Sequence, residues 1–271
     1  MLGTSRFYTL LLILFIITLL LYFVHLVYPN RKVNQAAFWL LAIVWGLHFL
    51  YLLYKGWSPG GGLFTSPSDS LFFYAWLIVS ISLLAHRFLN SELILFLANI
   101  VGFVFLAISV MTAGRDFSPS LASQLESEWI LIHIILAFFS YAAFTLSFIM
   151  SFLYMLEHFL LKKKMIKKLY QWPRLDRLDS AAYLLNVLGF PLFVISLLLG
   201  IIRAEEVLQF KVWLDVKVWF SAVVIGGYAL YFYLRLVQGR KGKGLAQLNI
   251  ACFLLLLANY FLSVQFTHFH T

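Results

Sequence analysis

Cysteine is almost absent from this chain of 271 residues, since Cys252 is the only one. A single cysteine excludes a disulfide framework within the chain and a Cys-x-x-Cys redox pair. Charged residues are also scarce, at 11% of the chain, whereas 63% of the residues are hydrophobic and the mean hydropathy is +0.92. A soluble domain of this length would have too little polar surface to cover itself. The composition therefore predicts an integral membrane protein.

Several sequence patterns of enzymes are missing as well. There is no P-loop, dinucleotide fingerprint, His-Glu-x-x-His or Gly-x-Ser-x-Gly sequence, and no apolar run holds paired carboxylates. We therefore expect no catalytic residues and a protein that is not an enzyme. The net charge of +9 could suggest a nucleic-acid partner. The basic residues lie in short segments between apolar runs, where they orient a membrane protein, so no nucleic-acid partner is expected.

Eight long apolar runs fill most of the chain. Each is long enough to cross a bilayer as a helix, and the roughly ten-residue alternation of membrane β-strands is absent. The sequence thus predicts an all-α, polytopic membrane protein that forms a single integral-membrane domain over residues 1–271. The fifth run would be about 50 Å long as a helix, which exceeds a bilayer core of about 30 Å. The eight runs are Phe7–Tyr28, Ala36–Tyr54, Ser70–His86, Leu93–Met111, Trp129–Leu161, Ala182–Ile202, Val218–Val237 and Leu245–Phe266.

The basic residues are distributed unequally between the two sides of these runs. Fourteen of the twenty Lys and Arg residues lie in one set of alternate connecting segments, among them Lys162–Lys164, and six lie on the other side with both termini. The positive-inside rule assigns the richer set to the cytoplasm. We therefore expect both termini on the outer side of a multi-pass protein in the inner (plasma) membrane, surrounded by membrane lipid.

Histidines gather at the predicted outer ends of two distant runs. His133 lies about one turn inside the fifth run, and His268 and His270 follow the eighth. Nitrogen ligands from two helices, aromatic walls and fixed cations fit a flat, doubly anionic iron compound such as haem. We therefore predict a haem site in which His133 and His268 bind the metal. The other residues expected to contact haem there are His270, Trp129, Trp213, Asp215, Lys217 and Trp219.

Each of these residues also has a purely structural explanation. His133 could hydrogen-bond a neighbouring helix, and the C-terminal histidines could belong to a frayed tail. Asp215 and Lys217 could form a surface ion pair, and tryptophans are common at membrane interfaces.

Two features of other runs point to further interpretations. His48, within the second run, is another candidate haem contact, because ionisable groups inside membranes are often functional. It could equally be a proton relay or a satisfied polar contact between helices. A transporter unrelated to haem stays open as an alternative, since Gly189-Phe190-Pro191 is expected to interrupt the sixth run.

Three stretches together resemble the haem-handling cytochrome c assembly family, which includes CcmC, CcsA and HemX. They are Trp129–His133 with Ser140–Phe144; Pro173–Asp179 with Leu188–Leu192 and Gly200–Ala204; and Asp215-x-Lys217 through Arg235, Gly239 and Gly242 to His268. Weaker similarity begins near Ser70, so about residues 70–271 match. The resemblance implies that His133 and His268 are the two external histidines that flank the family's tryptophan-rich haem loop. Of that loop's Trp-Asp-Pro-Lys run, this chain keeps Asp215 and Lys217.

The short chain, the reduced loop and the His-Phe-His ending are similar to the HemX branch of the family. This resemblance implies haem handling or sensing near the outer face, with a link to tetrapyrrole biosynthesis or cytochrome c biogenesis. One alternative is a membrane-anchored regulator whose basic loop, Lys162–Arg177, docks glutamyl-tRNA reductase. Another is a haem lyase or transport subunit that delivers haem to apocytochrome c together with cytochrome c biogenesis proteins.

Overall fold

The computed structural model describes residues 2–58, 62–86, 91–114, 128–164, 173–208 and 216–266. They belong to two compact units, Met1–Glu126 and Ser127–Thr271, which are considered one at a time. The described residues contain helices and no strand, and eight of the helices are long and apolar enough to cross a membrane. The all-α, polytopic prediction is thereby confirmed. The orientation of the termini and the single domain over residues 1–271 stay predictions.

Unit 1 is a bundle of four helices: α1 (Leu2–Val27), α2 (Arg31–Trp57), α3 (Pro67–His86) and α4 (Glu92–Thr112). Local chemistry sets their starts. The Asn30 side chain caps α2 by accepting a hydrogen bond of 2.9 Å from the Lys32 N–H. Pro67 begins α3, where its missing N–H costs no helical hydrogen bond. Each helix packs against the one before and after it, and α1 also packs against α4, which closes the bundle.

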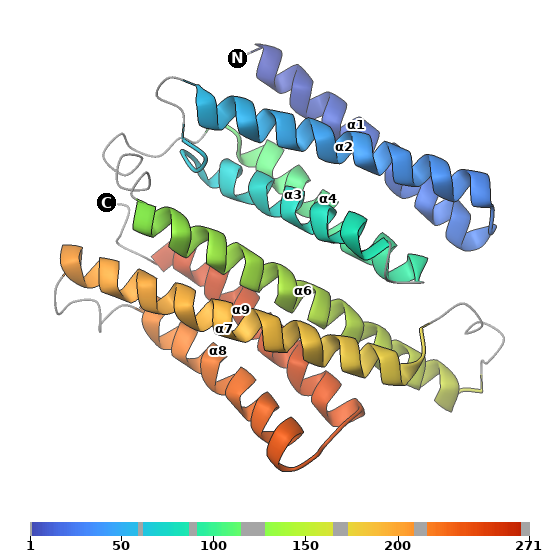
Figure 1. Cartoon of the computed structure of the whole chain (residues 1–271), viewed down its shortest axis with the longest axis vertical. Helices are drawn as coiled ribbons and strands as arrows, with labels where there is room; N and C mark the ends of the chain where they lie inside the picture. The colour runs from blue at the N-terminus through green and yellow to red at the C-terminus, as the bar shows by residue number, and fades with distance from the viewer. Residues whose placement is uncertain are drawn as a thin grey trace. The chain divides into compact units, whose positions relative to one another are not determined.

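Unit 2 repeats this order of neighbours with α6 (Glu128–Lys162), α7 (Leu175–Leu208), α8 (Val216–Phe232) and α9 (Lys243–Phe266). A π-helical turn, η3 (Tyr233–Val237), continues α8. Consecutive helices contact one another and α9 returns to α6, so the four helices alternate in direction around a closed bundle (Figure 1). One end of this bundle therefore holds the start of α6, the end of α7, the start of α8 and the end of α9. We call it the His133 end.

The expected apolar runs agree with these helices to within a few residues at most boundaries. The largest difference is at the start of α7, which begins at Leu175 rather than at Ala182. Its first turns carry charged residues, so they are helical without being apolar. The predicted interruption at Gly189-Phe190-Pro191 is wrong, because α7 continues through Pro191. Proline removes one backbone donor, a loss that membrane helices tolerate when their neighbours hold the turn.

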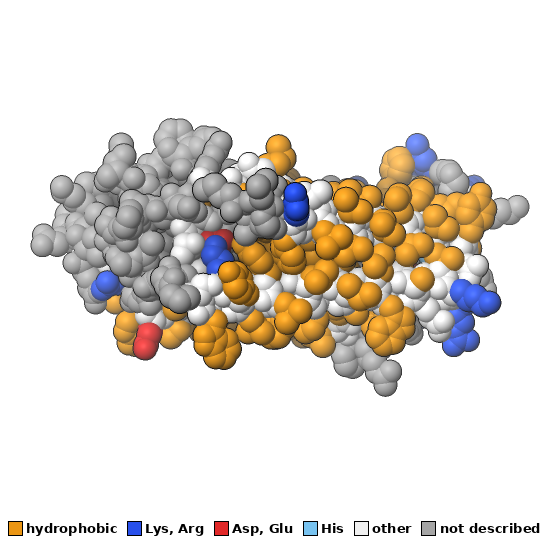
Figure 2. All heavy atoms as spheres, turned by 90° about the horizontal axis from the view of Figure 1, so that it is seen from above, with side chains coloured by type: hydrophobic (Ala, Val, Ile, Leu, Met, Phe, Trp, Pro, Cys, Tyr) orange, Lys and Arg blue, Asp and Glu red, His pale blue; other side chains and the backbone are white. Residues whose placement is uncertain are grey.

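The outward faces of the helices are apolar. On α1, Leu10, Ile13, Ile17 and Leu20 follow the spacing of one helical face and are all exposed. Hydrophobic side chains cover much of the described surface visible in Figure 2, and acidic side chains are rare there. A surface of this kind is stable against lipid tails and unstable in water. The chain is a multi-pass membrane protein.

Three hydrogen bonds connect α6 to α7 at regular intervals. On α6 the donors recur every seven residues, and on α7 the accepting backbone carbonyls also recur every seven residues. The pairs are His133 Nδ1 with Ser196 O (2.5 Å), Ser140 Oγ with Gly189 O (2.9 Å) and Ser147 Oγ with Ala182 O (2.9 Å). Seven residues are about two helical turns, so the three contacts lie on one face of each helix. We call this set the α6–α7 ladder.

A buried asparagine joins α9 to the same face of α6. Asn249 Nδ2 lies 2.8 Å from the Oγ atoms of both Ser147 and Ser151, and its Oδ1 accepts from Asn186 Nδ2 at 2.9 Å. Bonds of this kind hold membrane helices together because lipid offers polar groups no other partner. Three of the four helices are thus connected near the middle of unit 2.

Substitution of Gly189 by alanine should weaken the packing of α6 on α7. The new Cβ would lie 3.1 Å from Ala143 Cβ and 3.2 Å from Phe144 Cε1, both on the facing helix. Crowding of this degree costs about 1–3 kcal/mol of unfolding free energy, measurable as a lower melting temperature in detergent. Gly226→Ala is the control, because nothing lies within 4 Å of its added Cβ. Equal melting temperatures for the two variants would contradict the described packing.

Candidate ligand site at the His133 end

His133 projects from α6 and contacts two residues of α7, Ser196 and Gly200. Its Nδ1 atom lies 2.5 Å from the Ser196 carbonyl oxygen and 3.1 Å from the Ser196 hydroxyl oxygen. The same hydroxyl lies 3.0 Å from the His133 carbonyl oxygen, to which it donates. A Cβ added to Gly200 would lie 2.8 Å from His133 Cε1, so the imidazole ring rests against glycine backbone. The absence of a side chain at Gly200 makes room for the ring.

These contacts select one tautomer of the neutral imidazole. A carbonyl oxygen can only accept a hydrogen bond, so Nδ1 of His133 must carry the hydrogen. The lone pair then lies on Nε2. Metal-binding histidines commonly use this arrangement, in which one ring nitrogen donates to a carbonyl and the other binds the metal. The structural explanation, that His133 hydrogen-bonds a neighbouring helix, is confirmed, and Nδ1 is the atom that forms this bond.

Other described residues from the predicted site lie at the same end of unit 2. Trp129, four residues before His133 on α6, is 66% exposed, and Trp219 in the first turns of α8 is 64% exposed. Lys217 belongs to the first turn of α8, although its side chain lies outside the described part. The bundle therefore brings the helix starts that carry these three residues to the end where His133 lies.

Four predicted contacts fall outside the described residues. They are Trp213, Asp215, His268 and His270. Within the described ranges, no group of three or more His, Cys, Asp or Glu side chains could hold a metal ion. The part of the site that the structure describes is therefore a single oriented imidazole with neighbouring aromatic residues.

His48 belongs to unit 1 and is completely buried there. Its Nδ1 lies 2.9 Å from the carbonyl oxygen of Val44, one turn earlier on α2, and its ring centroid is 4.7 Å from that of Phe72. Nε2 is buried and has no hydrogen-bond partner among the described residues. The bond to Val44 gives His48 the same neutral tautomer as His133, with the hydrogen on Nδ1. The rings of Phe15 and Phe72 pack against the His48 ring.

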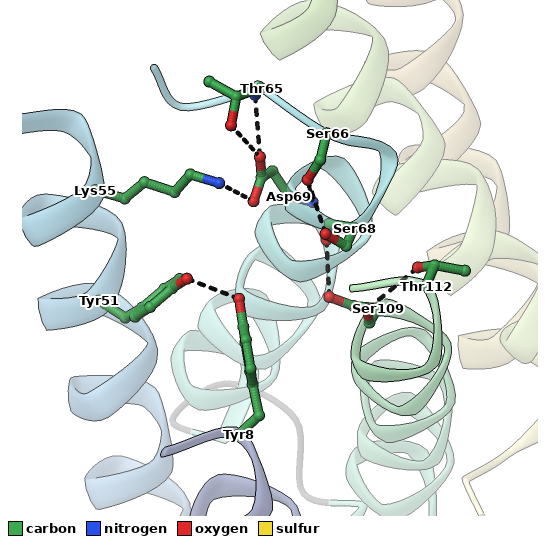
Figure 3. Close-up of polar contacts among 9 residues, drawn as sticks. All are labelled: Tyr8, Tyr51, Lys55, Thr65, Ser66, Ser68, Asp69, Ser109 and Thr112. Carbon is green, nitrogen blue, oxygen red and sulfur yellow. Dashed lines mark hydrogen bonds and ion pairs between the residues drawn. The ribbon is translucent and has the colours of Figure 1, made fainter. Parts of the chain in front are cut away.

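A polar cluster that the sequence analysis did not single out lies where α2, α3 and α4 meet in unit 1 (Figure 3). Asp69 is buried, forms an ion pair with Lys55, and accepts hydrogen bonds from the Thr65 N–H at 3.0 Å and the Thr65 hydroxyl at 2.9 Å. Nearby, Ser109 Oγ on α4 donates to the Ser68 carbonyl at 2.8 Å. These groups satisfy one another, so the cluster fixes the turn before α3. Residues 63–66 form turns and bends in this connection.

A second unanticipated group lies at the opposite end of unit 2 from His133. Asp179 on α7 accepts from Arg235 Nη1 at 2.6 Å and from the Gly242 N–H at 3.1 Å. Gly242 has a φ of +86°, a conformation that side chains other than glycine rarely adopt. Arg235 lies within the π-helical turn η3, and such turns are frequent at functional positions. This contact could not be predicted from sequence, since Asp179 and Arg235 are 56 residues apart.

Comparison with known proteins gives consistent matches. The family described as "Cytochrome C assembly protein" matches residues 66–270. Protein HemX of Bacillus subtilis (strain 168) is 41% identical over 260 residues, covering 96% of this chain and 94% of that protein. Protein HemX of Brevibacillus brevis is 40% identical, covering 97% and 96%. Cytochrome c biogenesis protein CcsA of Chlamydomonas reinhardtii is 27% identical, covering 73% of this chain and 57% of that protein.

The burial of His48 generates a stability prediction. His48→Met should change the unfolding free energy by less than about 1 kcal/mol or increase it, because the unpaired buried Nε2 disappears and the helical carbonyl of Val44 keeps its backbone partner. Asn99→Leu is the control in the same unit, since it removes the 2.7 Å bond to Ser82 that joins α4 to α3. Melting in detergent should rank His48→Met clearly above Asn99→Leu. The reverse order would show that His48 supports the fold.

Proposed function

Because this chain belongs to the cytochrome c assembly protein family, we propose that it binds haem at the His133 end of unit 2, with His133 and His268 as the axial ligands. The family is associated with haem handling. Haem would supply an iron that binds nitrogen ligands, and the neutral imidazoles of His133 and His268 would hold it. The role proposed is handling or sensing of haem in the membrane, linked to tetrapyrrole biosynthesis or cytochrome c biogenesis, and not bond-making.

The observation that carries this proposal is the hydrogen bond from His133 Nδ1 to the Ser196 carbonyl. It fixes the lone pair on Nε2, which is the atom an iron would need. A histidine that served only to join two helices would not require aromatic or cationic residues at the same end of the bundle. Here, exposed Trp129 lies one turn away, and the start of α8 contributes Lys217 and Trp219 to the same end.

The register of α6 against α9 supports His268 as the second ligand. The two helices run antiparallel, with the rings of Tyr141 and Tyr260 6.5 Å apart and those of Phe148 and Phe253 4.6 Å apart. Moving seven residues along α6, from Tyr141 to Phe148, therefore corresponds to moving seven residues back along α9, from Tyr260 to Phe253. His133 comes eight residues before Tyr141, and His268 comes eight residues after Tyr260. Continued pairing of this kind would set position 268 opposite position 133.

The remaining predicted contacts have roles in this proposal that follow from their chemistry. Lys217 would neutralise a haem propionate, with Asp215 orienting a donor beside it. Trp129, Trp213 and Trp219 would offer flat apolar surfaces to the porphyrin. His270 is the alternative to His268 as ligand. His48 would act separately within unit 1, and the haem content of the His48→Met variant tests that role.

Haem binding is tested on full-length protein purified from haem-replete cells. Wild type should show the Soret band of a six-coordinate, low-spin haem, and His133→Ala and His268→Ala should each lower haem affinity at least about tenfold, because each removes an iron ligand. His158→Ala is the matched control, since His158 lies on α6 at the opposite end and stacks on Tyr154. Absence of haem from wild type, or unchanged affinity in both ligand variants, would refute the proposal.

The opposite end of unit 2 favours a second role, the docking of a soluble enzyme. Only one carboxylate there, Asp176, is exposed among the described residues. The exposed cations are Lys162, Lys163, Lys164, Arg174, Arg177, Arg240, Lys241 and Lys243. Such an excess attracts acidic partners and holds this end in the cytoplasm of a plasma-membrane protein. We propose glutamyl-tRNA reductase as the partner, on the basis of the likeness to HemX.

Charge reversal tests this docking role separately from haem binding. Lys162→Glu with Lys163→Glu and Lys164→Glu should lower co-purification of glutamyl-tRNA reductase at least about tenfold, because the attraction becomes repulsion. Haem content should not change, since these residues lie at the other end of α6. Replacement of the same lysines by arginine is the control and should retain the partner. Full retention by the reversed variant would exclude this surface as the docking site.

A further inference from the structure

We infer that Ser196 and Gly200 of α7 are positioning residues that hold His133 ready to bind a metal through Nε2. Ser196 would fix the tautomer of the imidazole, and Gly200 would leave the space in which the ring stands. This inference rests on the proposed haem-binding function, although its structural part concerns the haem-free chain and can be tested without haem.

Ser196 presents two acceptors and no donor to His133 Nδ1. Its carbonyl oxygen lies 2.5 Å from Nδ1, and its hydroxyl oxygen lies 3.1 Å from it. The hydroxyl has a single hydrogen, which is directed at the His133 carbonyl oxygen 3.0 Å away. The hydroxyl oxygen can therefore only accept from Nδ1. Because Ser196 is almost fully buried, water does not compete for these bonds.

Gly200 lies one turn beyond Ser196 on α7. Ser196 and Gly200 together form the slot that holds the His133 ring. A Cβ at this position would meet three ring atoms of His133, with Cε1 at 2.8 Å, Nδ1 at 3.1 Å and Nε2 at 3.4 Å. The ring cannot move away easily, since its hydrogen bonds to Ser196 hold it. Any side chain at residue 200 would therefore displace the imidazole or break its bond to the carbonyl.

The other contacts of the α6–α7 ladder show what simple helix joining requires. Ser140 and Ser147 each donate to one carbonyl of α7, at 2.9 Å in both cases. Only His133 has a second acceptor on the same residue and an adjacent glycine in contact with its ring. A serine would suffice to continue the ladder. The extra features control the orientation and tautomer of an imidazole, which matter for a ligand and not for helix packing.

The structural part is tested by nitrogen-15 NMR of histidine-labelled, haem-free protein, with His133 assigned by its loss in His133→Gln. Wild type should show His133 protonated on Nδ1, and Gly200→Ala should shift that resonance. Gly226→Ala and Ser140→Ala are controls that should leave it unchanged, because neither position contacts the ring. Protonation on Nε2 in wild type, or no shift in Gly200→Ala, would overturn the inference whatever happens with haem.

The functional part is tested by haem titration of the same variants. Gly200→Ala should lower haem affinity about 10–100-fold, the usual effect of losing support for a metal ligand, and Ser196→Ala should lower it less because the carbonyl remains. In a His133→Gly background supplied with imidazole, Gly200→Ala should have no further effect, since no tethered ring meets the added methyl group. A loss that persists in that background would identify a general packing defect and overturn the assignment.

These results also separate the two proposals. If His133→Gly binds haem as wild type does, His133 is not the ligand. The NMR experiment would still test whether Ser196 and Gly200 set the tautomer and position of the His133 ring. If His133→Gly loses haem but Gly200→Ala binds it normally, the ligand stands and the positioning roles of Ser196 and Gly200 are wrong.

Discussion

A bilayer core offers no water to a polar side chain, so each one must find its partner within the protein. In unit 2 this constraint produces the α6–α7 ladder, whose three contacts repeat every seven residues on both helices. The ladder sets the register of α6 against α7. It also places His133 against Ser196 and Gly200, and the tautomer and orientation of the imidazole follow from that placement. Residues that join the two helices thereby also orient the imidazole that we propose as a ligand.

The two ends of unit 2 differ in chemistry, as the two proposed roles, haem binding and enzyme docking, would require. The His133 end carries exposed Trp129 and Trp219, whereas the opposite end carries most of the exposed cations. Near the middle of the bundle, Asn249 ties α9 to α6. At the end opposite His133, Asp179 ties α7 to η3 and to the turn at Gly242. Separate polar contacts thus join the helices at the His133 end, near the middle and at the opposite end of unit 2.

The eight spans could be predicted from sequence because hydropathy reports a property of each residue by itself. Contacts between helices could not, since they depend on register and on which helices are neighbours. The adjacency of α6 and α9, left open by the sequence, is shown by the Tyr141–Tyr260 and Phe148–Phe253 pairs. A signal for the ladder was present in the spacing of His133, Ser140 and Ser147. Gly200 gave no such signal, because a glycine in an apolar helix reveals its neighbour only in three dimensions.

The central claim, that position 133 of α6 faces position 268 beyond α9, is tested most directly by thiol crosslinking in a Cys252→Ala background. A short bifunctional reagent should join His133→Cys to His268→Cys within one chain, as it should join Tyr141→Cys to Tyr260→Cys, whose native rings are in contact. The pair His133→Cys and Lys243→Cys, at opposite ends of the bundle, should not react. Crosslinking at 141 and 260 without crosslinking at 133 and 268 would contradict the account.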